Sequence, residues 1–245
     1  DYAPGDPTNL IDWAVYARSD RYLVRKYHEE TNLRAHVLLD ISASLGFRDE
    51  GPVSKLECAS FLAAGAMFML LNQGDSVGLV TFDGRIRDVF KPVGTSEELR
   101  PLLLHLEGLK AAGESRIEPC LHEAAGLIGQ PGLVILISDF LADADAVIRG
   151  IRHFNHDGHN LIVFHVSDRG ERRLGFAGLA ELRDMETRAR LVVESDEIRE
   201  AYESAVENHL QKIRHACTEC MADYHLVDTA DPVDETLHRL GGRTV

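Results

Sequence analysis

The sequence predicts a doubly wound α/β domain, in which a mostly parallel central sheet with one antiparallel edge strand carries helices on both faces. Short apolar runs rich in branched residues alternate with longer segments of helical spacing. These runs are almost continuously apolar, as in strands covered on both faces, and lack the alternation of a half-exposed strand. Short connections between the segments favour right-handed crossovers between parallel strands.

Five apolar runs are expected to form the buried strands of the sheet. They span residues 35–40, 77–82, 133–139, 160–166 and 224–227. Residues 86–90 alternate between apolar and polar side chains directly after the turn Asp83-Gly84. This pattern predicts an antiparallel edge strand that pairs with the strand before it.

Segments with helical spacing separate the strands. They span residues 54–72, 96–106, 117–128, 144–155, 196–220 and 233–240. The first ends at Gln73-Gly74, a typical stop signal, and Asp143 is expected to cap the helix that follows it.

The chain is expected to hold one domain, residues 34–245, preceded by an arm of residues 1–33. No internal repeat, low-complexity tract or interdomain linker interrupts the strand and helix pattern. The arm is polar and rich in turn signals, and we expect its Trp13, the only tryptophan, to bury its ring against the domain.

Composition excludes several classes of function. The 26 basic and 40 acidic side chains give a formal net charge of −14, which repels nucleic-acid phosphates. No apolar run approaches the roughly 18 residues of a membrane span, so none is expected in this chain. Cys217 and Cys220 lie in a helical run without a second cysteine pair, which favours a structural role over zinc binding. Four cysteines are too few for a disulfide scaffold, and we expect a reduced, cytoplasmic setting.

Hydroxyls and carboxylates follow two of the predicted strands. Asp40, Ser42 and Ser44 end the first strand and the loop after it, Ser115 precedes the helix that starts near residue 117, and Asp139 ends the fourth strand. With the strand order 3-2-1-4-5-6, the first and fourth strands would flank the crevice where ligands bind in such sheets. Oxygen donors of this kind suit a hard cation such as Mg2+, with Mn2+ or Ca2+ as alternatives.

Two other interpretations of these residues stay open at this point. Serine and aspartate at a strand-to-helix junction commonly cap helices, and Ser115 could cap the helix after it. Asp40 could also serve a Mg2+-assisted hydrolase or phosphotransferase. Against an enzyme, the chain has no Walker-type phosphate loop, no Asp-x-Asp pair after the first strand and no Gly-x-Ser-x-Gly elbow. We therefore expect a binding protein.

The five residues resemble the metal-ion-dependent adhesion site of von Willebrand factor A-type (VWA) domains. The family pattern is Asp-x-Ser-x-Ser after the first strand, a threonine on a mid-domain loop and an aspartate ending the fourth strand. Asp40, Ser42, Ser44 and Asp139 match it, whereas Ser115 stands at the threonine position and lacks the methyl group that stiffens the side chain. The resemblance implies adhesion through a metal shared with a partner's Asp or Glu. The serine keeps open a scaffold with a degenerate site.

A narrower resemblance covers nearly the whole chain. It is to the bacterial VWA-like group catalogued as domain of unknown function fifty-eight, whose own beginning is expected to lie before Asp1. The matching segments are Tyr2-x-Pro-Gly-Asp6, Ile11-Asp12-Trp13, Lys55, Ser138-Asp139-Phe140 and Asp184-Met185-Glu186. The resemblance implies a MoxR-type AAA+ ATPase as the partner.

Overall fold

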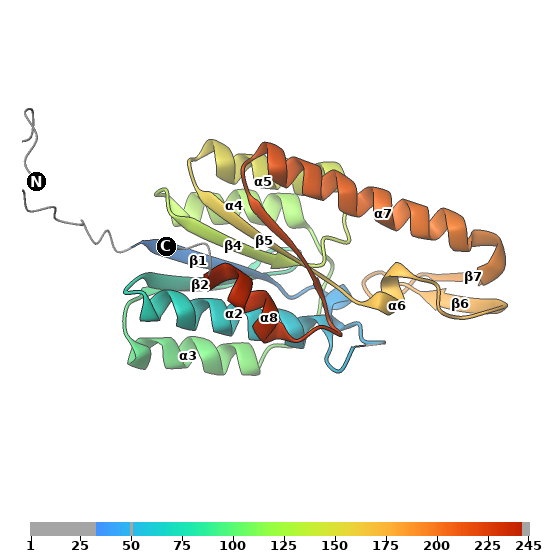
Figure 1. Cartoon of the computed structure of the whole chain (residues 1–245), viewed down its shortest axis with the longest axis horizontal. Helices are drawn as coiled ribbons and strands as arrows, with labels where there is room; N and C mark the ends of the chain where they lie inside the picture. The colour runs from blue at the N-terminus through green and yellow to red at the C-terminus, as the bar shows by residue number, and fades with distance from the viewer. Residues whose placement is uncertain (1–32, 50, 242–245) are drawn as a thin grey trace, which may run out of the picture. The chain divides into compact units, whose positions relative to one another are not determined.

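A six-stranded sheet forms the centre of the protein in the computed structural model, which describes residues 33–49 and 51–241 (Figure 1). The strands run in the order β3-β2-β1-β4-β5-β8, and only β2 and β3 pair antiparallel. This confirms the predicted order 3-2-1-4-5-6 and the antiparallel edge. The strands are β1 (Arg34–Asp40), β2 (Ser76–Phe82), β3 (Ile86–Val93), β4 (Leu133–Ser138), β5 (Asn160–Ser167) and β8 (Asp223–Asp228). The predicted arm and Trp13 lie outside the described residues, except for Leu33.

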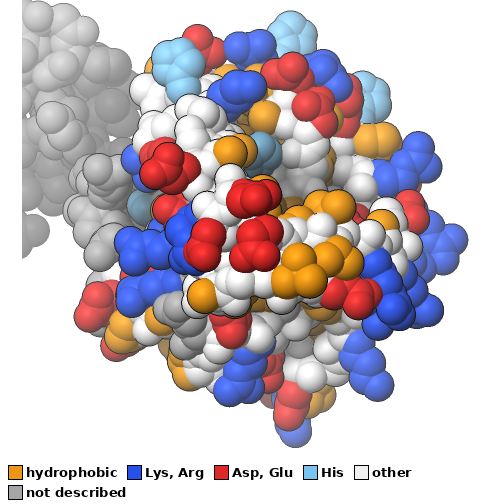
Figure 2. Space-filling view, turned by 90° about the vertical axis from the view of Figure 1, so that its right-hand side faces the viewer, with side chains coloured by type: hydrophobic (Ala, Val, Ile, Leu, Met, Phe, Trp, Pro, Cys, Tyr) orange, Lys and Arg blue, Asp and Glu red, His pale blue; other side chains and the backbone are white. Residues whose placement is uncertain are grey.

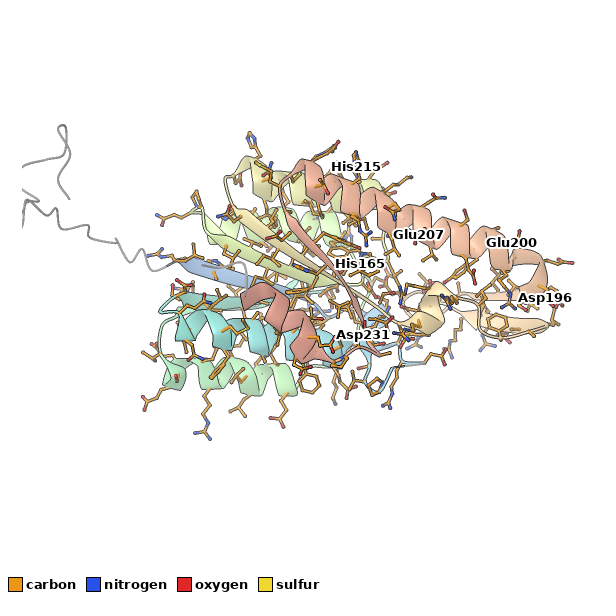
Figure 3. All side chains as sticks on the ribbon, viewed as in Figure 1. His165, Asp196, Glu200, Glu207, His215 and Asp231 are labelled. Carbon is orange, nitrogen blue, oxygen red and sulfur yellow. The ribbon has the colours of Figure 1, made fainter. Side chains whose placement is uncertain are left out.

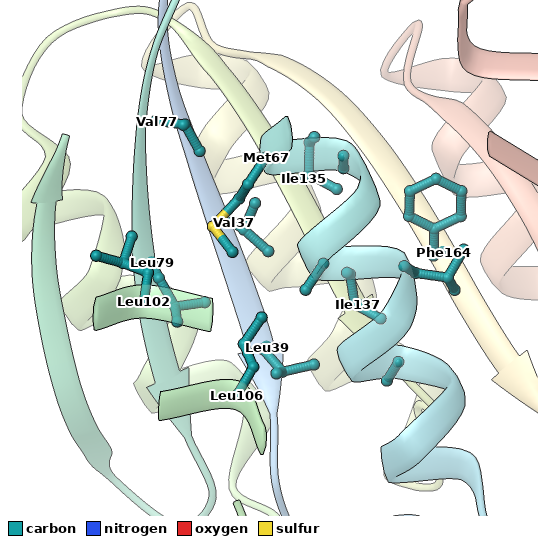
Figure 4. Close-up of a cluster of buried hydrophobic side chains, with 14 of the residues drawn as sticks. Val37, Leu39, Met67, Val77, Leu79, Leu102, Leu106, Ile135, Ile137 and Phe164 are labelled. Atoms are coloured by element: carbon teal, nitrogen blue, oxygen red, sulfur yellow. The ribbon is translucent and has the colours of Figure 1, made fainter. Parts of the chain in front are cut away.

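Helices cover both faces of the sheet (Figure 1). One face carries α2 (Lys55–Asn72), α3 (Ser96–Glu107) and α8 (Val233–Gly241), and the other carries α4 (Ile117–Ile128), α5 (Ala144–His156) and α7 (Ser195–Glu219). Val37 and Leu39 of β1 pack with Met67 of α2 in the first core (Figure 4). Leu38 between them belongs to the second core, with α4 and α5. Because both of their faces are buried, the central strands β1, β2 and β4 carry no polar alternation, whereas the edge strand β3 alternates as predicted.

Helix α2 is the longest element of the first core. Ser54 and Glu57 form a reciprocal capping box at its start. Among the described residues it is the one helix long and apolar enough to cross a membrane, and 56% of it is buried inside the protein. Such burial is typical of the core helix of a globular domain.

The segment between β5 and α7 was not foreseen from the sequence. It contains α6 (Arg169–Arg172) and a hairpin of β6 (Leu179–Arg183) and β7 (Arg190–Glu194). A short helix after β1, η2 (Ala43–Gly46), was also not predicted. The hairpin lies beyond the carboxyl edge of the sheet, beside the start of α7 (Figure 1). One boundary also differs at this edge: β4 ends at Ser138, so Asp139 is the first residue of a loop.

Cys217 and Cys220 pack in the second core near the end of α7. Burial raises the pKa of the Cys217 thiol to about 12. Both cysteines therefore stay protonated and serve as small apolar side chains.

Candidate metal site

The carboxyl ends of β1 and β4 bring two buried aspartates together. Asp40 ends β1 with no exposed surface, and Asp139 follows β4 with 2% exposed. The strands pair in parallel, with Leu39 opposite Ile137. Burial, followed by the nearby charge of Asp139, raises the pKa of Asp40 to about 7. This edge thus concentrates negative charge where water screens it little.

The Asp40 carboxylate is fixed in place by two hydrogen bonds. Its Oδ1 accepts a hydrogen bond from the Ser42 backbone N–H at 2.9 Å, and its Oδ2 accepts one from the Ser138 hydroxyl at 2.7 Å. The Ser138 hydroxyl in turn accepts a hydrogen bond from the Phe140 backbone N–H at 2.9 Å. Ser138 therefore ties the loop after β4 to the end of β1, a role that its sequence position did not reveal.

Ser42 and Ser44 lie on the loop from β1 into η2. Their hydroxyl oxygens are 3.2 Å apart, and both residues are buried. Ser42 precedes η2 but makes no side-chain capping hydrogen bond, and Ser54 caps α2. Helix capping therefore does not account for these two hydroxyls.

Ser115 lies on the loop between α3 and α4, which runs beside the loop after β1. The Ala43 N–H donates to the Gly113 carbonyl at 2.9 Å, and the Ala112 N–H donates to the Ile41 carbonyl at 2.9 Å. The residue that caps α4 is Arg116, without a side-chain bond, so capping does not explain Ser115 either. The structure thus brings all five predicted residues to one edge of the sheet.

Lys55, at the start of α2, adds one positive charge to this edge. Its Nζ lies 2.7 Å from Asp139 Oδ2 and 2.7 Å from the Glu171 carboxylate, and its side chain is fully buried. Burial opposes the ammonium form, but Asp139 and Glu171 outweigh it and raise the pKa of Lys55. Lys55 is part of the resemblance to the family, but nothing in the sequence around it indicates a role.

Phe140 holds the loop after Asp139 in an unusual conformation. Its φ is +50°, in the left-handed region that non-glycine residues rarely adopt. Its ring is 1% exposed, and its carbonyl lies 2.9 Å from His209 Nε2 of α7. Packing and hydrogen bonds on both sides keep this strained turn in place, which orients the carboxylate of Asp139.

Glu186, in the turn of the β6–β7 hairpin, reaches the same edge. Its Oε2 accepts a hydrogen bond from the Ser115 backbone N–H at 2.9 Å. Burial raises the pKa of Glu186, and the charge of Asp139 adds to this rise, while the Ser115 N–H and the Ser44 hydroxyl oppose it. The Asp184-Met185-Glu186 segment is part of the resemblance to the family. No pattern in the neighbouring sequence indicates that it lies near Ser115.

Two hollows open at this edge. A groove of about 660 Å³ runs between Ser44, Glu171 and the hairpin turn, and a second hollow of about 370 Å³ is lined by Asp139, His165 and Tyr202, among others. Figure 2 shows acidic side chains gathered at the centre of this end, with apolar side chains beside them. Further acidic residues, Asp196, Glu200 and Glu207, follow α7 past the sheet (Figure 3). The end of the molecule formed by the hairpin and the start of α7 is therefore acidic at its centre.

All five predicted metal ligands have oxygen donors in their side chains. Among the described residues, no three His, Cys, Asp or Glu side chains are grouped as a metal site by themselves. The predicted set is different, since it combines two carboxylates with three hydroxyls, the oxygen donors that Mg2+ accepts. The carboxylates of Asp40, Asp139, Glu171 and Glu186 share this edge with the Lys55 ammonium, and these five groups together carry a formal charge of −3 when all are ionised. A divalent cation would offset most of that charge.

Comparison with known families places the chain. Residues 1–212 match the family described as Protein of unknown function DUF58. The chain belongs to this family. It is also 26% identical over 190 residues to the Uncharacterized protein Rv1480 of Mycobacterium tuberculosis and to the Uncharacterized protein Mb1516 of Mycobacterium bovis. Each match covers 76% of this chain and 59% of the relative, so this DUF58 chain spans less than two thirds of those proteins.

Solved structures show that the DUF58 fold is VWA-like. BatB from Bacteroides thetaiotaomicron superposes with a TM-score of 0.54 at 17% identity, covering 86% of this chain and 98% of that one. The SpRpn10 VWA domain gives 0.52 at 12% identity, with 85% and 94% covered. The pilus adhesin SpaC from Lactobacillus rhamnosus GG gives 0.54 at 11% identity, with 89% and 31% covered. At these identities the likeness establishes the fold, and any function must be argued from the site.

Proposed function

We propose that this DUF58 domain is a metal-dependent protein-interaction module, with no catalytic role. Asp40, Ser42, Ser44, Ser115 and Asp139 would hold Mg2+, or Mn2+ or Ca2+ in its place. Once bound, the cation supplies a positive charge that an Asp or Glu of a partner protein can coordinate. The observation that carries the proposal is the pair of buried carboxylates, Asp40 and Asp139, beside two buried hydroxyls that serve no helix cap.

Electrostatics supports a cation at this edge. Two aspartates buried close together repel each other, and this repulsion adds to the burial that raises the pKa of Asp40. Lys55 offsets part of the charge at Asp139 Oδ2, while Asp139 Oδ1 accepts a long 3.3 Å hydrogen bond from the Leu141 N–H. Among the residues that the structure describes, no cation lowers the pKa of Asp40. A divalent ion among the oxygens of Asp40, Ser42 and Ser44 would satisfy the remaining charge.

The proposed partner is a MoxR-type AAA+ ATPase in the cytoplasm. Resemblance to the DUF58 group motivates this choice, and the groove lined by Ser44 and the hairpin turn would give a partner access to the metal. A bound cation would let the partner's carboxylate dock on a surface that otherwise repels it.

Equilibrium binding to the purified MoxR-type ATPase of the same organism tests the proposal. Binding should require Mg2+ and be lost in EDTA and in the Asp40→Asn variant. The exposed Asp157→Asn at the end of α5 is the matched control, since it removes the same charge at the opposite edge of the sheet, next to the start of β5. Equal binding in EDTA, or by Asp40→Asn, would contradict a metal-mediated interaction.

A further inference from the structure

The turn of the β6–β7 hairpin is built to point one side chain at the site. Oδ1 of Asp184 accepts hydrogen bonds from the backbone N–H groups of Glu186 at 2.9 Å and Thr187 at 2.6 Å. The Asp184 N–H donates to the Ala189 carbonyl at 2.8 Å, and Arg188 adopts a φ of +60°. These bonds close a tight turn with Glu186 at its tip.

This turn lies against both loops that carry the predicted hydroxyl donors. The Glu186 carboxylate accepts a hydrogen bond from the Ser115 N–H at 2.9 Å, and Ser44 lines the same groove. Met185 packs beside Gly46, two residues after Ser44. The Met185 Cε would lie 3.5 Å from a Cβ atom placed on Gly46. The hairpin therefore closes over the open side of the edge.

The second carboxylate oxygen of Glu186 has no well-formed hydrogen bond to any residue that the structure describes. This atom, Oε1, is buried. A buried carboxylate oxygen that gives up water without a replacement is unfavourable, so such an atom points to a missing ligand. The negative charge of Asp139 nearby makes the position still less favourable without a cation.

We propose that Glu186 is an internal ligand of the metal site, which fills the position that a partner's Asp or Glu would take. This inference rests on the proposed metal site. A carboxylate oxygen is the donor that Mg2+ and Mn2+ accept, and Glu186 is placed beside two of the predicted donors, Ser44 and Ser115. A partner must then displace the hairpin turn before its own carboxylate can bind.

The hairpin is suited to such displacement. It consists of two strands that pair only with each other, and two-stranded hairpins are marginally stable on their own. Most of its large apolar side chains face solvent: Leu179 is 73%, Leu191 62% and Val192 61% exposed. Little buried area is therefore lost when the turn moves, and the cost of releasing Glu186 is set mainly by its bond to the metal.

Calorimetric titration of Mn2+ into the metal-free chain tests the inference, with Glu186→Gln as the variant. Glu181→Gln is the matched control, because Glu181 lies on the same hairpin and pairs with Arg190 on the surface. We expect Glu186→Gln to weaken Mn2+ binding by about tenfold, since the number of charged ligands sets the affinity of such sites. Glu181→Gln should bind Mn2+ as the wild-type chain does.

Water-proton relaxation of the bound Mn2+ gives a second readout. In Glu186→Gln a water replaces the carboxylate, so the relaxation enhancement at saturation should rise above that of the wild-type chain. Acetate, as a free carboxylate probe, should then lower this enhancement at smaller concentrations than in the wild-type chain. Unchanged affinity and relaxation in Glu186→Gln would overturn the inference alone and leave Glu186 as a partner of the Ser115 N–H. No Mn2+ binding by the wild-type chain would overturn the proposed function as well.

Discussion

Lys55 Nζ lies 2.7 Å from Asp139 Oδ2, and both side chains are buried. The pair joins the start of α2 to the loop after β4, and Glu171 of α6 completes it. One aspartate of the candidate site is therefore held by an internal cation, while the other, Asp40, is held by hydrogen bonds from Ser42 and Ser138.

Removing the Lys55 charge should destabilise the protein strongly. Lys55→Met leaves Asp139 and Glu171 buried without their cation, and breaking a buried pair in this way costs about 3–5 kcal/mol. Urea unfolding measures the change. The matched control is Arg149→Met, which removes an ion pair of 2.7 Å with Glu118 on the surface and should have a far smaller effect. Similar losses of unfolding free energy in the two variants would mean that the buried Lys55 pair stabilises the protein no more than a surface ion pair does.

Gly113 should be needed for the loop that carries Ser115. Its φ is +85°, and a Cβ there would lie 2.6 Å from Asp83 Oδ2. Gly74 has a φ of +89° with open space around it, so Gly74→Ala should cost about 1–2 kcal/mol from backbone strain alone. Gly113→Ala should lower the free energy of unfolding by about 1–3 kcal/mol more than Gly74→Ala does, because of the added clash with Asp83. It should also weaken Mg2+ binding. Thermal unfolding and calorimetry check this; equal effects of the two variants would argue against a shaped loop.

Ser115→Thr should strengthen metal binding. The added methyl group restricts χ1, so less side-chain entropy is lost when the hydroxyl is fixed. We expect Mg2+ to bind about two- to fivefold more tightly, measured by calorimetry. Weaker binding than in the wild-type chain would show that the loop has no room for the methyl group.

His36 should make stability depend on pH. Burial, followed by the charges of His159 and Arg34, lowers the pKa of His36 to about 4, and its buried Nδ1 has no hydrogen-bond partner among the described residues. The unfolded chain therefore takes up the proton first as the pH falls. The stability that depends on neutral His36 is complete above pH 6.5, the ordinary value, and is lost between that pH and about 4.

Urea unfolding across this pH range tests the role of His36. In His36→Gln, the slope of unfolding free energy against pH should fall by about 1.4 kcal/mol per pH unit, the contribution of one proton. An unchanged slope would mean that His36 titrates alike in the folded and unfolded chain. Because His36 lies at the opposite end of β1 from Asp40, Mg2+ binding should not change.

The sheet and the meeting of its two aspartates could be predicted because both depend on local patterns. Continuous apolar runs marked the buried strands, and their order alone placed Asp40 beside Asp139. The β6–β7 hairpin escaped prediction because its strands are short and largely exposed, so no buried face left a pattern in the sequence.

Lys55 and Glu186 could not be assigned for a different reason. A charged residue is normally solvent-exposed, and only packing in three dimensions shows otherwise. The partner of Lys55 lies 84 residues away in sequence, and Ser115 lies 71 residues from Glu186. Side-chain contacts over such separations leave no trace in the spacing of residues along one chain.

Titration of Mg2+ into the metal-free domain, followed by calorimetry, tests the central claim most directly. Saturable binding at one site is predicted for the wild-type chain and should be abolished by Asp40→Ala, with the circular dichroism of the fold retained. Absence of saturable binding in the wild-type chain, or equal binding by Asp40→Ala, would contradict a metal site at the ends of β1 and β4.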